Sequence, residues 1–308
     1  SVGSDRSVRC YYCSEIANDY NMSERDNKNS WLFITLAAAA MLMITMGARQ
    51  SQGLFVFPIS GSTGVSIVTI SFAMAVGQFM WGAVAPVAGA LADRFGAARV
   101  LAGGVLVLAL GTALTPLLTT GSGLVLTIGI LTALGSGAGS FSILIGTVMK
   151  RLPPAHRGTA AGIITAGGSL GQFVFAPIAQ NLISLWGWMG AMWSLSVMAL
   201  FALPLVRSIS GPPVNATEAR AEAASGVLSA VVKKAFADRS YLLLHGSFLT
   251  CGFHIAFLVT HLPGEVGLCG LPASVASWSL AIIGLSNIAG SFTAGWLLNR
   301  FRGKDVLF

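Results

Sequence analysis

Formal charges in this sequence lie in compact clusters, separated by long stretches that are almost free of charge. Four such stretches follow the amino-terminal 28 residues: 29–92, with only Arg49; 100–149; 158–206; and 240–299, with only Glu265. A helix needs about 20 apolar residues to cross a bilayer. Each stretch is therefore long enough for two spanning helices joined by a short turn.

The composition also indicates a membrane protein. Of the 308 residues, 54% are hydrophobic and 9% are charged, and the mean hydropathy is +0.76. Charged residues make up about a quarter of an average soluble chain. This shortfall excludes ordinary cytosolic enzymes, disordered proteins and small disulfide scaffolds. Barrel-type strand alternation is absent, and helices satisfy their backbone without water, so we predict an all-α membrane protein.

Small or helix-breaking residues divide each stretch into two helices. The predicted turns are Ser60–Gly64, Thr119–Gly123, Ser184–Trp188 and Pro263–Pro272. Eight spans result, at 31–59, 67–90, 100–118, 124–149, 158–181, 188–206, 241–262 and 272–299.

The basic residues predict the orientation of these spans. Of the 18 Lys and Arg, four lie in the amino-terminal tail, one is Arg49, and the other 13 follow spans two, four, six and eight. The opposite turns contain none. By the positive-inside rule the basic loops and the amino terminus are cytoplasmic, in a cell membrane. The net charge of +7 is then a topology signal, and no soluble basic module suggests nucleic-acid binding.

Polar segments complete the predicted organisation. Residues 1–30 form a cytoplasmic tail, and its first 21 residues are interpreted as not native because Met22 is a plausible start. Residues 31–206 form a six-helix bundle, residues 207–240 a central cytoplasmic loop, and residues 241–308 two further helices of a partial second bundle. Cys10 and Cys13 form a lone C-x-x-C pair, which is weak evidence for metal or redox chemistry and is interpreted as inert.

A short motif recurs after spans two and eight. The first copy is GALADRFGAARV (Gly89–Val100) and the second is GWLLNRFRGKDV (Gly295–Val306). Six predicted spans lie between the two copies. Matched loops at equivalent points argue for two related six-helix halves, as in many secondary transporters.

The first copy resembles the signature loop between helices two and three of the major facilitator superfamily. Two further stretches, Gly47–Pro58 and Cys251–His261, resemble its bacterial monocarboxylate-porter-like branch, which includes oxalate/formate antiporter relatives. The resemblance implies the superfamily fold, with a complete amino-terminal six-helix bundle and the first two helices of a second bundle. It also implies alternating access around a midplane substrate site.

The sequence departs from this family in several ways. Twelve helices are usual, whereas Phe308 ends the sequence where a ninth would begin, so we expect a truncated chain. The family's signature Asp contacts helix eleven and an arginine in helix four, and span four has no arginine. Span eight lacks the arginine that binds oxalate in the antiporters, which argues against oxalate. The alternative function is a transport-inactive family member that acts at most as a membrane interaction protein.

Arg49 is the leading candidate for substrate binding, because a guanidinium within a span is costly unless it faces a partner or a water-filled cavity. Thr45, Arg49 and Gln52 follow i, i+4, i+7 spacing, and a guanidinium can bind a carboxylate through two parallel hydrogen bonds. The alternative is that Arg49 extends to the outer headgroups.

Other spans carry further candidates. Ser247, Thr250, His254 and His261 share one predicted face of span seven, and His254 could relay a proton with the substrate. Thr165, Ser169 and Gln172 form a polar stripe on span five, and Gln78 lies alone on span two. We predict substrate contacts for Gln52, Gln78, Gln172 and His254 beside Arg49. Helix packing explains the small polar residues equally well.

The signature loop is the predicted cytoplasmic gate, formed by Gly89, Asp93, Arg94, Gly96 and Arg99. Ion pairs in this loop can form in one access state, where they hold the cytoplasmic mouth closed, and separate in the other. A loop that only sets the membrane orientation would not need Asp93, because acidic residues contribute little to the positive-inside rule. The presence of Asp93 therefore favours a gating role. No catalytic constellation, metal cluster, nucleotide motif or cofactor site is apparent. We therefore expect a non-enzymatic secondary transporter of a small organic anion, a monocarboxylate, with possible proton coupling and the lipid bilayer as its environment.

Overall fold

The computed structural model describes residues 31–209, 234 and 236–298, and within these ranges every regular element is a helix. The predicted tail 1–30 with Cys10 and Cys13, most of the loop 207–240, and the end of the second motif copy lie outside the described residues.

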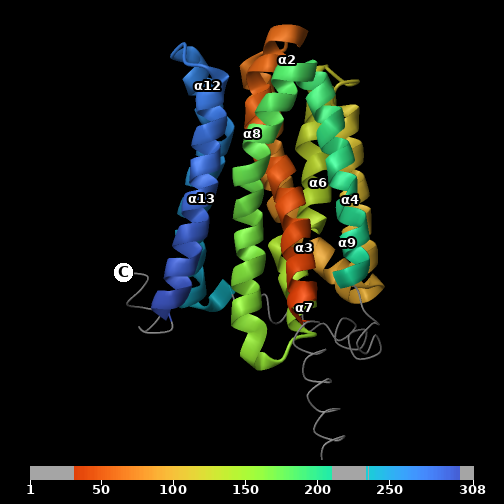
Figure 1. Cartoon of the computed structure of the whole chain (residues 1–308), viewed down its shortest axis with the longest axis vertical. Coiled ribbons are helices and arrows are strands. Elements are labelled where there is room, and N and C mark those ends of the chain that lie inside the picture. The colour runs from red at the N-terminus through yellow and green to blue at the C-terminus, as the bar shows by residue number, and fades with distance from the viewer. Residues whose placement is uncertain (1–30, 210–233, 235, 299–308) are drawn as a thin grey trace, which may run out of the picture.

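The helices are long and run nearly side by side (Figure 1). The first span comprises a helix over 31–50, the 3₁₀ turn η1 (Gln52–Phe55) and α2 (Val56–Thr63). The next two are α3 (Ile67–Phe95) and α4 (Ala97–Leu114). The fourth comprises α5 (Gly121–Leu124), the π-helix η2 (Val125–Leu131), α6 (Thr132–Ala138) and α7 (Phe141–Met149). The remaining helices are α8 (Pro154–Leu200), α9 (Ala202–Ile209), α12 (Arg239–Leu268) and α13 (Ala273–Leu298).

Seven helical stretches of the described chain are long and apolar enough to cross a membrane. The longest, His156–Ile209, contains a break at Gly187, whose φ of 68° and ψ of 174° are not helical. A positive φ favours glycine because it has no Cβ. The chain reverses there, between the ascending part of α8 and its descending part with α9 (Figure 1). Eight crossing segments result, which agrees with the spacing of the charges.

The helix boundaries follow from local chemistry. Ser66 caps α3 by accepting a hydrogen bond from Thr69 N at 3.2 Å, and Thr120 caps α5 in the same way through Gly123 N at 3.1 Å. Such caps satisfy amides that have no partner within the helix. At the other end of α3, Gly96 has a φ of 91°. The glycine permits the sharp turn into α4.

Two large buried apolar clusters connect the first six crossing segments, and one of them also includes Val259 of α12 and Leu280 of α13. One cluster lies toward the α2 end and includes Phe55, Ile59, Ile70, Leu124 and Leu195. The other lies toward the α7 end and includes Met41, Leu101, Leu144, Ile164 and Val206. Ser196 ties α8 to α4 by donating to Ala109 O at 2.8 Å.

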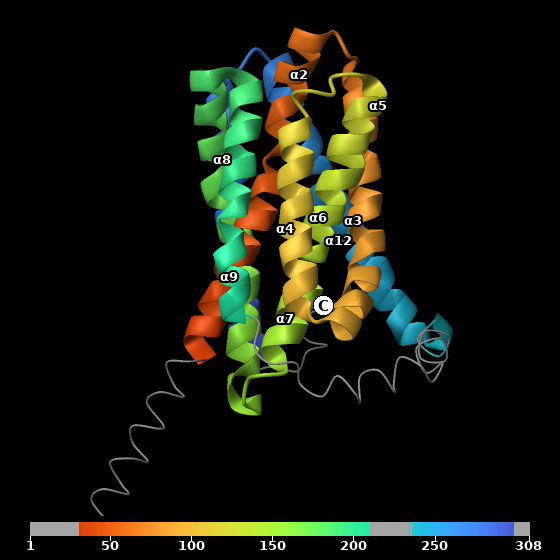
Figure 2. The ribbon, with the colours of Figure 1, turned by 90° about the vertical axis from the view of Figure 1, so that its right-hand side faces the viewer.

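The last two helices lie along one side of this bundle. α13 packs against α8, whereas α12 contacts η1 and α2 (Figure 1). Val259 and Val266 of α12 are buried, but residues 239–255 are almost all exposed. The amino-terminal half of α12 swings away from the bundle toward the α7 end (Figure 2). The two parts therefore meet closely at the α2 end and separate at the α7 end.

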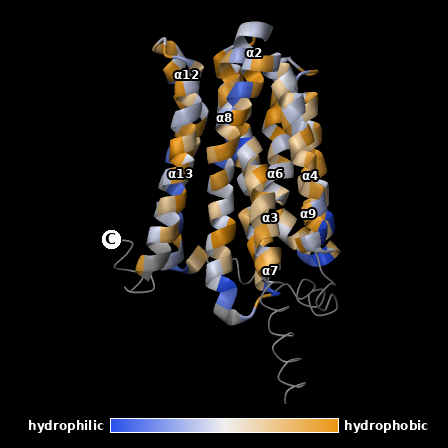
Figure 3. Cartoon of the chain, in the orientation of Figure 1, coloured by the Kyte–Doolittle hydropathy of each residue, from blue (hydrophilic) through white to orange (hydrophobic). Residues whose placement is uncertain are grey.

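The surface pattern suits a bilayer. Large apolar side chains are exposed on many of the helices; they include Phe72, Phe79, Leu106, Val197 and Phe253. Hydrophilic residues gather toward the α7 end (Figure 3). The basic residues Arg94, Arg99, Lys150, Arg157 and Arg207 all belong to helix ends or loops on that side. The chain is thus a multi-pass membrane protein with one basic end.

Candidate functional site

A cavity of about 490 Å³ lies between the six-segment bundle and α12. Its lining comes from the first span, α3, the fourth span, α8, α12 and α13. This volume falls within the range of about 300–1,000 Å³ found for small-molecule sites. The cavity contains four of the five residues that were predicted to bind substrate: Arg49, Gln52, Gln78 and Gln172.

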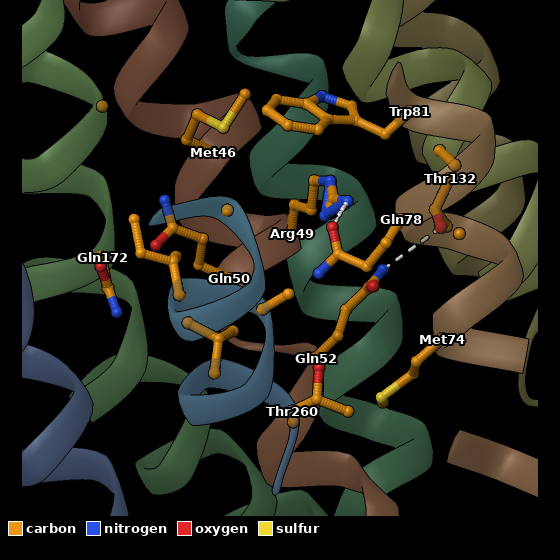
Figure 4. A pocket seen from close by; sticks show the side chains of 18 of the residues that line it. Met46, Arg49, Gln50, Gln52, Met74, Gln78, Trp81, Thr132, Gln172 and Thr260 are labelled. Atoms are coloured by element: carbon orange, nitrogen blue, oxygen red, sulfur yellow. Dashed lines mark hydrogen bonds between the residues drawn. The ribbon is translucent and has the colours of Figure 1, made fainter. Parts of the chain in front are cut away.

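Arg49 is partly buried at the end of the helix over 31–50. Its Nη2 donates a hydrogen bond to Gln78 Oε1 on α3, and its guanidinium carbon lies 4.6 Å from the centre of the Trp81 ring (Figure 4). Among the described residues that line the cavity, Arg49 alone carries a formal charge. Gln78 and Trp81 therefore orient the guanidinium without neutralising it.

Gln52 and Thr132 extend the polar surface beside Arg49. Gln52 Nε2 donates to Thr132 Oγ1 at 3.3 Å (Figure 4). Thr132 Oγ1 in turn donates to the backbone oxygen of Ile128. Thr45, expected on the same face, is instead fully buried and donates to Met41 O at 3.1 Å. A Cβ added at Gly139 would lie 3.2 Å from Thr45 Cγ2, so Thr45 packs against the fourth span instead of facing the cavity.

Three buried nitrogen atoms in the cavity lining have no hydrogen-bond partner. They are Arg49 Nε, Trp81 Nε1 and Gln172 Nε2. Leaving a buried donor unpaired costs about 1–3 kcal/mol. The cavity is thus rich in donors and favours a ligand that supplies acceptors.

The predicted polar face of α12 does not line the cavity. His254 is exposed, and its Nδ1 lies 3.1 Å from Thr250 O in the preceding turn. The residues of α12 that line the cavity are Phe248, Cys251, Gly252, Ile255, Ala256, Val259 and Thr260. Since successive residues are about 100° apart around a helix, the predicted stripe lies on a different face. Periodicity alone could not decide which face turns inward.

Sequence reasoning missed several lining residues. Trp81 follows Gln78 by three residues, so helical spacing could have identified it. Thr132 lies within an apolar stretch, and Asn287 lies on α13, where a lone amide gave no pattern. Of the span-five stripe, Ser169 and Gln172 line the cavity, whereas Thr165 does not.

The predicted gate lies at the α7 end. Asp93 Oδ1 accepts from Lys150 Nζ at 2.8 Å, which links α3 to the residue after α7. Lys150 thus supplies a cation near the end of span four, where no arginine was found. Both side chains are more than half exposed. Because both belong to the six-segment bundle, the pair does not bridge the bundle to α12.

The other motif residues are arranged locally. The Arg94 guanidinium carbon lies 5.2 Å from the centre of the Phe95 ring, and Arg99 Nη1 donates to Phe95 O at 3.4 Å. A Cβ added at Gly89 would meet nothing within 4 Å. Gly96 is required by its positive φ, whereas the position of Gly89 shows no steric need for glycine.

Comparison with known proteins agrees with this architecture. Residues 32–308 match the family model described as Major Facilitator Superfamily. Monocarboxylate transporter 13 of Rattus norvegicus is 26% identical over 279 residues, which cover 87% of this chain and 60% of the relative. The Oxalate:formate antiporter of Oxalobacter formigenes is 30% identical over 164 residues, which cover 52% of this chain and 37% of the antiporter.

A solved structure supports the fold alone. The crystal structure of D-xylose-proton symporter aligns with a TM-score of 0.64 at 16% identity, over 88% of this chain and 69% of that chain. The chain spans about six-tenths of the length of the monocarboxylate transporter 13 relatives that it matches.

Proposed function

The chain belongs to the Major Facilitator Superfamily, and from this premise we propose that it carries a small organic anion, a monocarboxylate, across a membrane by alternating access. The observation that carries the proposal is the unneutralised guanidinium of Arg49 in the cavity. A charge placed within a membrane protein is costly unless it is paired or hydrated. A bound carboxylate would supply the missing charge through two parallel hydrogen bonds.

The charge of the lining supports a monoanion. The described lining has one cation and no carboxylate, so a second negative charge on the substrate would be buried without a partner. The monocarboxylate transporter relatives are consistent with this choice by their names. Their identity to this chain is low, and the assignment to a monocarboxylate-porter-like branch is part of the proposal.

The arrangement of α12 supports alternating access. Its contacts with η1 and α2 close the cavity at the α2 end, while its exposed amino-terminal half leaves the α7 end open. If the basic α7 end is cytoplasmic, as the positive-inside rule predicts, the structure is an inward-open state. The Asp93–Lys150 pair would then stabilise the mouth within one bundle.

Proton symport remains a separate prediction. The cavity lining in the described chain has no His, Asp or Glu, and His254 lies outside it. A proton-coupled mechanism would therefore use a group beyond this lining or the substrate's own carboxyl group.

The test is uptake by liposomes that contain the purified chain. Labelled lactate, pyruvate and formate would be offered with and without an imposed pH gradient, and empty liposomes would give the background. We expect saturable uptake that Arg49→Ala abolishes and Arg207→Ala retains. Arg207 is a matched control because it is an exposed arginine at the end of α9.

The variant data would decide the role of Arg49. Saturable uptake that survives Arg49→Ala would contradict the proposed carboxylate site, provided that both variants insert equally well. Uptake that does not respond to the pH gradient would contradict symport while leaving anion transport intact.

A further inference from the structure

We propose that the cavity selects monocarboxylates whose far end carries an uncharged hydrogen-bonding group, and that Gln172 recognises this group. The inference rests on the proposed function, because it takes Arg49 as the site of the carboxylate. It adds a second recognition point to the substrate and names the residue responsible.

Gln172 is placed for such a role. It lines the cavity from α8, is 1% exposed, and its Nε2 has no hydrogen-bond partner. Buried side-chain amides almost always find a partner. An unpaired amide beside a cavity therefore points to a ligand group that completes it.

The packing of α13 against α8 confines this side chain. A Cβ added at Gly284 would lie 3.2 Å from Gln172 Cβ, and 2.8 Å from both Ser169 O and Phe173 N. Glycine thus lets α13 approach the α8 backbone directly beside Gln172. The close approach limits the space available to the Gln172 side chain on the α13 side, which favours the cavity.

The polar groups of the cavity form two separate sets. Arg49, Gln78 and Thr132 lie together, whereas Gln172 lies on the other side of the cavity (Figure 4). On that other side Gln50 lies near Gln172 (Figure 4), and the polar lining residues also include Ser169, one turn before Gln172 on α8, and Asn287, one turn after Gly284 on α13. We call Ser169, Gln172 and Asn287 the far wall. Its three side chains are polar and uncharged.

Apolar residues make up much of the remaining lining, beside Gln52 and Thr260. Met46, Phe141 and Ile255 are among them. A ligand that fits this pattern has a carboxylate at one end, an apolar middle and a polar, neutral group at the other. The lining therefore favours a different chemical group at each end of the substrate.

The chemistry of the far wall excludes two other kinds of end group. A second carboxylate would be desolvated there without a cation. A plain alkyl end would leave the Gln172 amide unpaired, which is unfavourable when the amide is buried. A hydroxyl both donates and accepts hydrogen bonds, as an amide does. The two groups are therefore complementary in either orientation of the Gln172 amide.

The test measures binding to the purified full chain by calorimetry. The probes are straight-chain alkanoates, ω-hydroxyalkanoates and α,ω-dicarboxylates of four, six and eight carbons. At the best-fitting length we expect the hydroxyalkanoate to bind about tenfold more tightly than the alkanoate, as one added hydrogen bond to a buried group would give. The dicarboxylate should bind more weakly than the hydroxyalkanoate.

Variants assign this preference to Gln172. Gln172→Met keeps the length of the side chain but removes its amide, and should reduce the tenfold preference for the hydroxyalkanoate to less than threefold. The matched control is Gln180→Met, which alters another glutamine of α8, two turns away and outside the cavity lining. It should retain the full preference.

The outcomes separate this inference from the proposed function. Alkanoate binding that depends on Arg49, with no preference for the hydroxyl at any length, would overturn the role of Gln172 alone. A preference that survives Gln172→Met, or tighter binding of the dicarboxylate, would also overturn it. If no probe binds in a manner that Arg49→Ala abolishes, the carboxylate site and the proposed function fail first.

Discussion

At the scale of single residues, the polar interior is organised around one guanidinium. Arg49 is held by an amide acceptor, Gln78, and by the face of Trp81, neither of which carries a negative charge. A guanidinium has five donors, and its Nε is buried and unpaired. These contacts fix the position of the cation and leave its charge available to a ligand.

Placing an internal carboxylate beside Arg49 should therefore mimic a bound anion. We expect Gln78→Glu to weaken monocarboxylate binding at least tenfold, because the new carboxylate would pair with Arg49. Gln78→Met removes the same hydrogen bond without adding charge, and should have a smaller effect. Binding measured by calorimetry checks this, and equal losses in the two variants would mean that the hydrogen bond rather than the charge is decisive.

The exposed Asp93–Lys150 pair should matter more for transport than for stability. Side-chain exposures of 59% and 65% imply a contribution below about 1 kcal/mol to the folded state. Asp93→Asn should therefore change the melting temperature little, leave substrate binding intact and slow exchange. Lys150→Met should reproduce the effect if the pair is the relevant contact. Unchanged exchange rates in Asp93→Asn would remove Asp93 from the gate.

At the scale of elements, the fourth span shows how an irregular helix is accommodated in a membrane protein. It passes through α5, the π-helix η2, α6 and α7, with a break at Gly139 and Ser140. Irregular backbone at membrane depth is tolerated where protein surrounds it, and this span is the most buried of the seven candidate spans. η2 and α6 also supply Ile128 and Thr132 to the cavity.

Close packing of α4 against α6 depends on glycine. A Cβ added at Gly135 would lie 2.3 Å from Leu108 N, a backbone atom that cannot move aside. Gly135→Ala should therefore destabilise the protein by about 1–3 kcal/mol. At Gly103 of α4 a Cβ would meet nothing within 4 Å, so Gly103→Ala should be neutral or stabilising by up to about 1 kcal/mol. The melting temperature should fall in Gly135→Ala and stay the same or rise in Gly103→Ala, and a similar fall in both would contradict this packing.

The sequence predicts the elements better than their faces. Charge-free stretches and breaking residues identified eight crossing segments, because a bilayer requires long apolar helices. The irregular geometry of the fourth span was not predictable, since it depends on burial by other helices. Dependence on tertiary contacts also explains which site residues the sequence could predict. Arg49 was found because a charge within a span is rare, whereas His254 was misplaced because its helix is apolar on several sides and only tertiary contacts decide which side faces the cavity.

At the scale of the whole molecule, the cavity is sealed at the α2 end by close backbone packing. A Cβ added at Gly53 would lie 2.0 Å from Val259 O of α12, and one added at Gly264 would lie 3.1 Å from the Phe57 ring. This seal joins the six-segment bundle to α12, whereas Asp93 and Lys150 lie within the bundle. Opening the cavity at the α2 end would therefore require the Gly53–Val259 contact to separate.

Enlarging Gly53 should shift the protein toward a state that is open at the α2 end. Cys251 lines the cavity and reports access. In oriented vesicles with Cys269→Ser as background, a membrane-impermeant maleimide should reach Cys251 from the α2 side faster in Gly53→Val. Gly61→Val is the matched control, because a Cβ at Gly61 would meet nothing within 4 Å. Equal labelling rates in the two variants would argue against this seal.

The orientation of the whole molecule can be tested with a native thiol. Cys269 is exposed at the end of α12, on the side of the molecule opposite Arg94 and Lys150, and Cys251 lines the cavity. The positive-inside rule places the basic α7 end in the cytoplasm. An impermeant maleimide added to intact cells should therefore label Cys269, and Cys269→Ser should abolish that signal. Cys251→Ser should leave it unchanged, because the seal at the α2 end protects Cys251 from outside. Labelling of Cys269 only after the membrane is opened would mean that the protein inserts with its basic end outward, and the state described as inward-open would then face the opposite compartment.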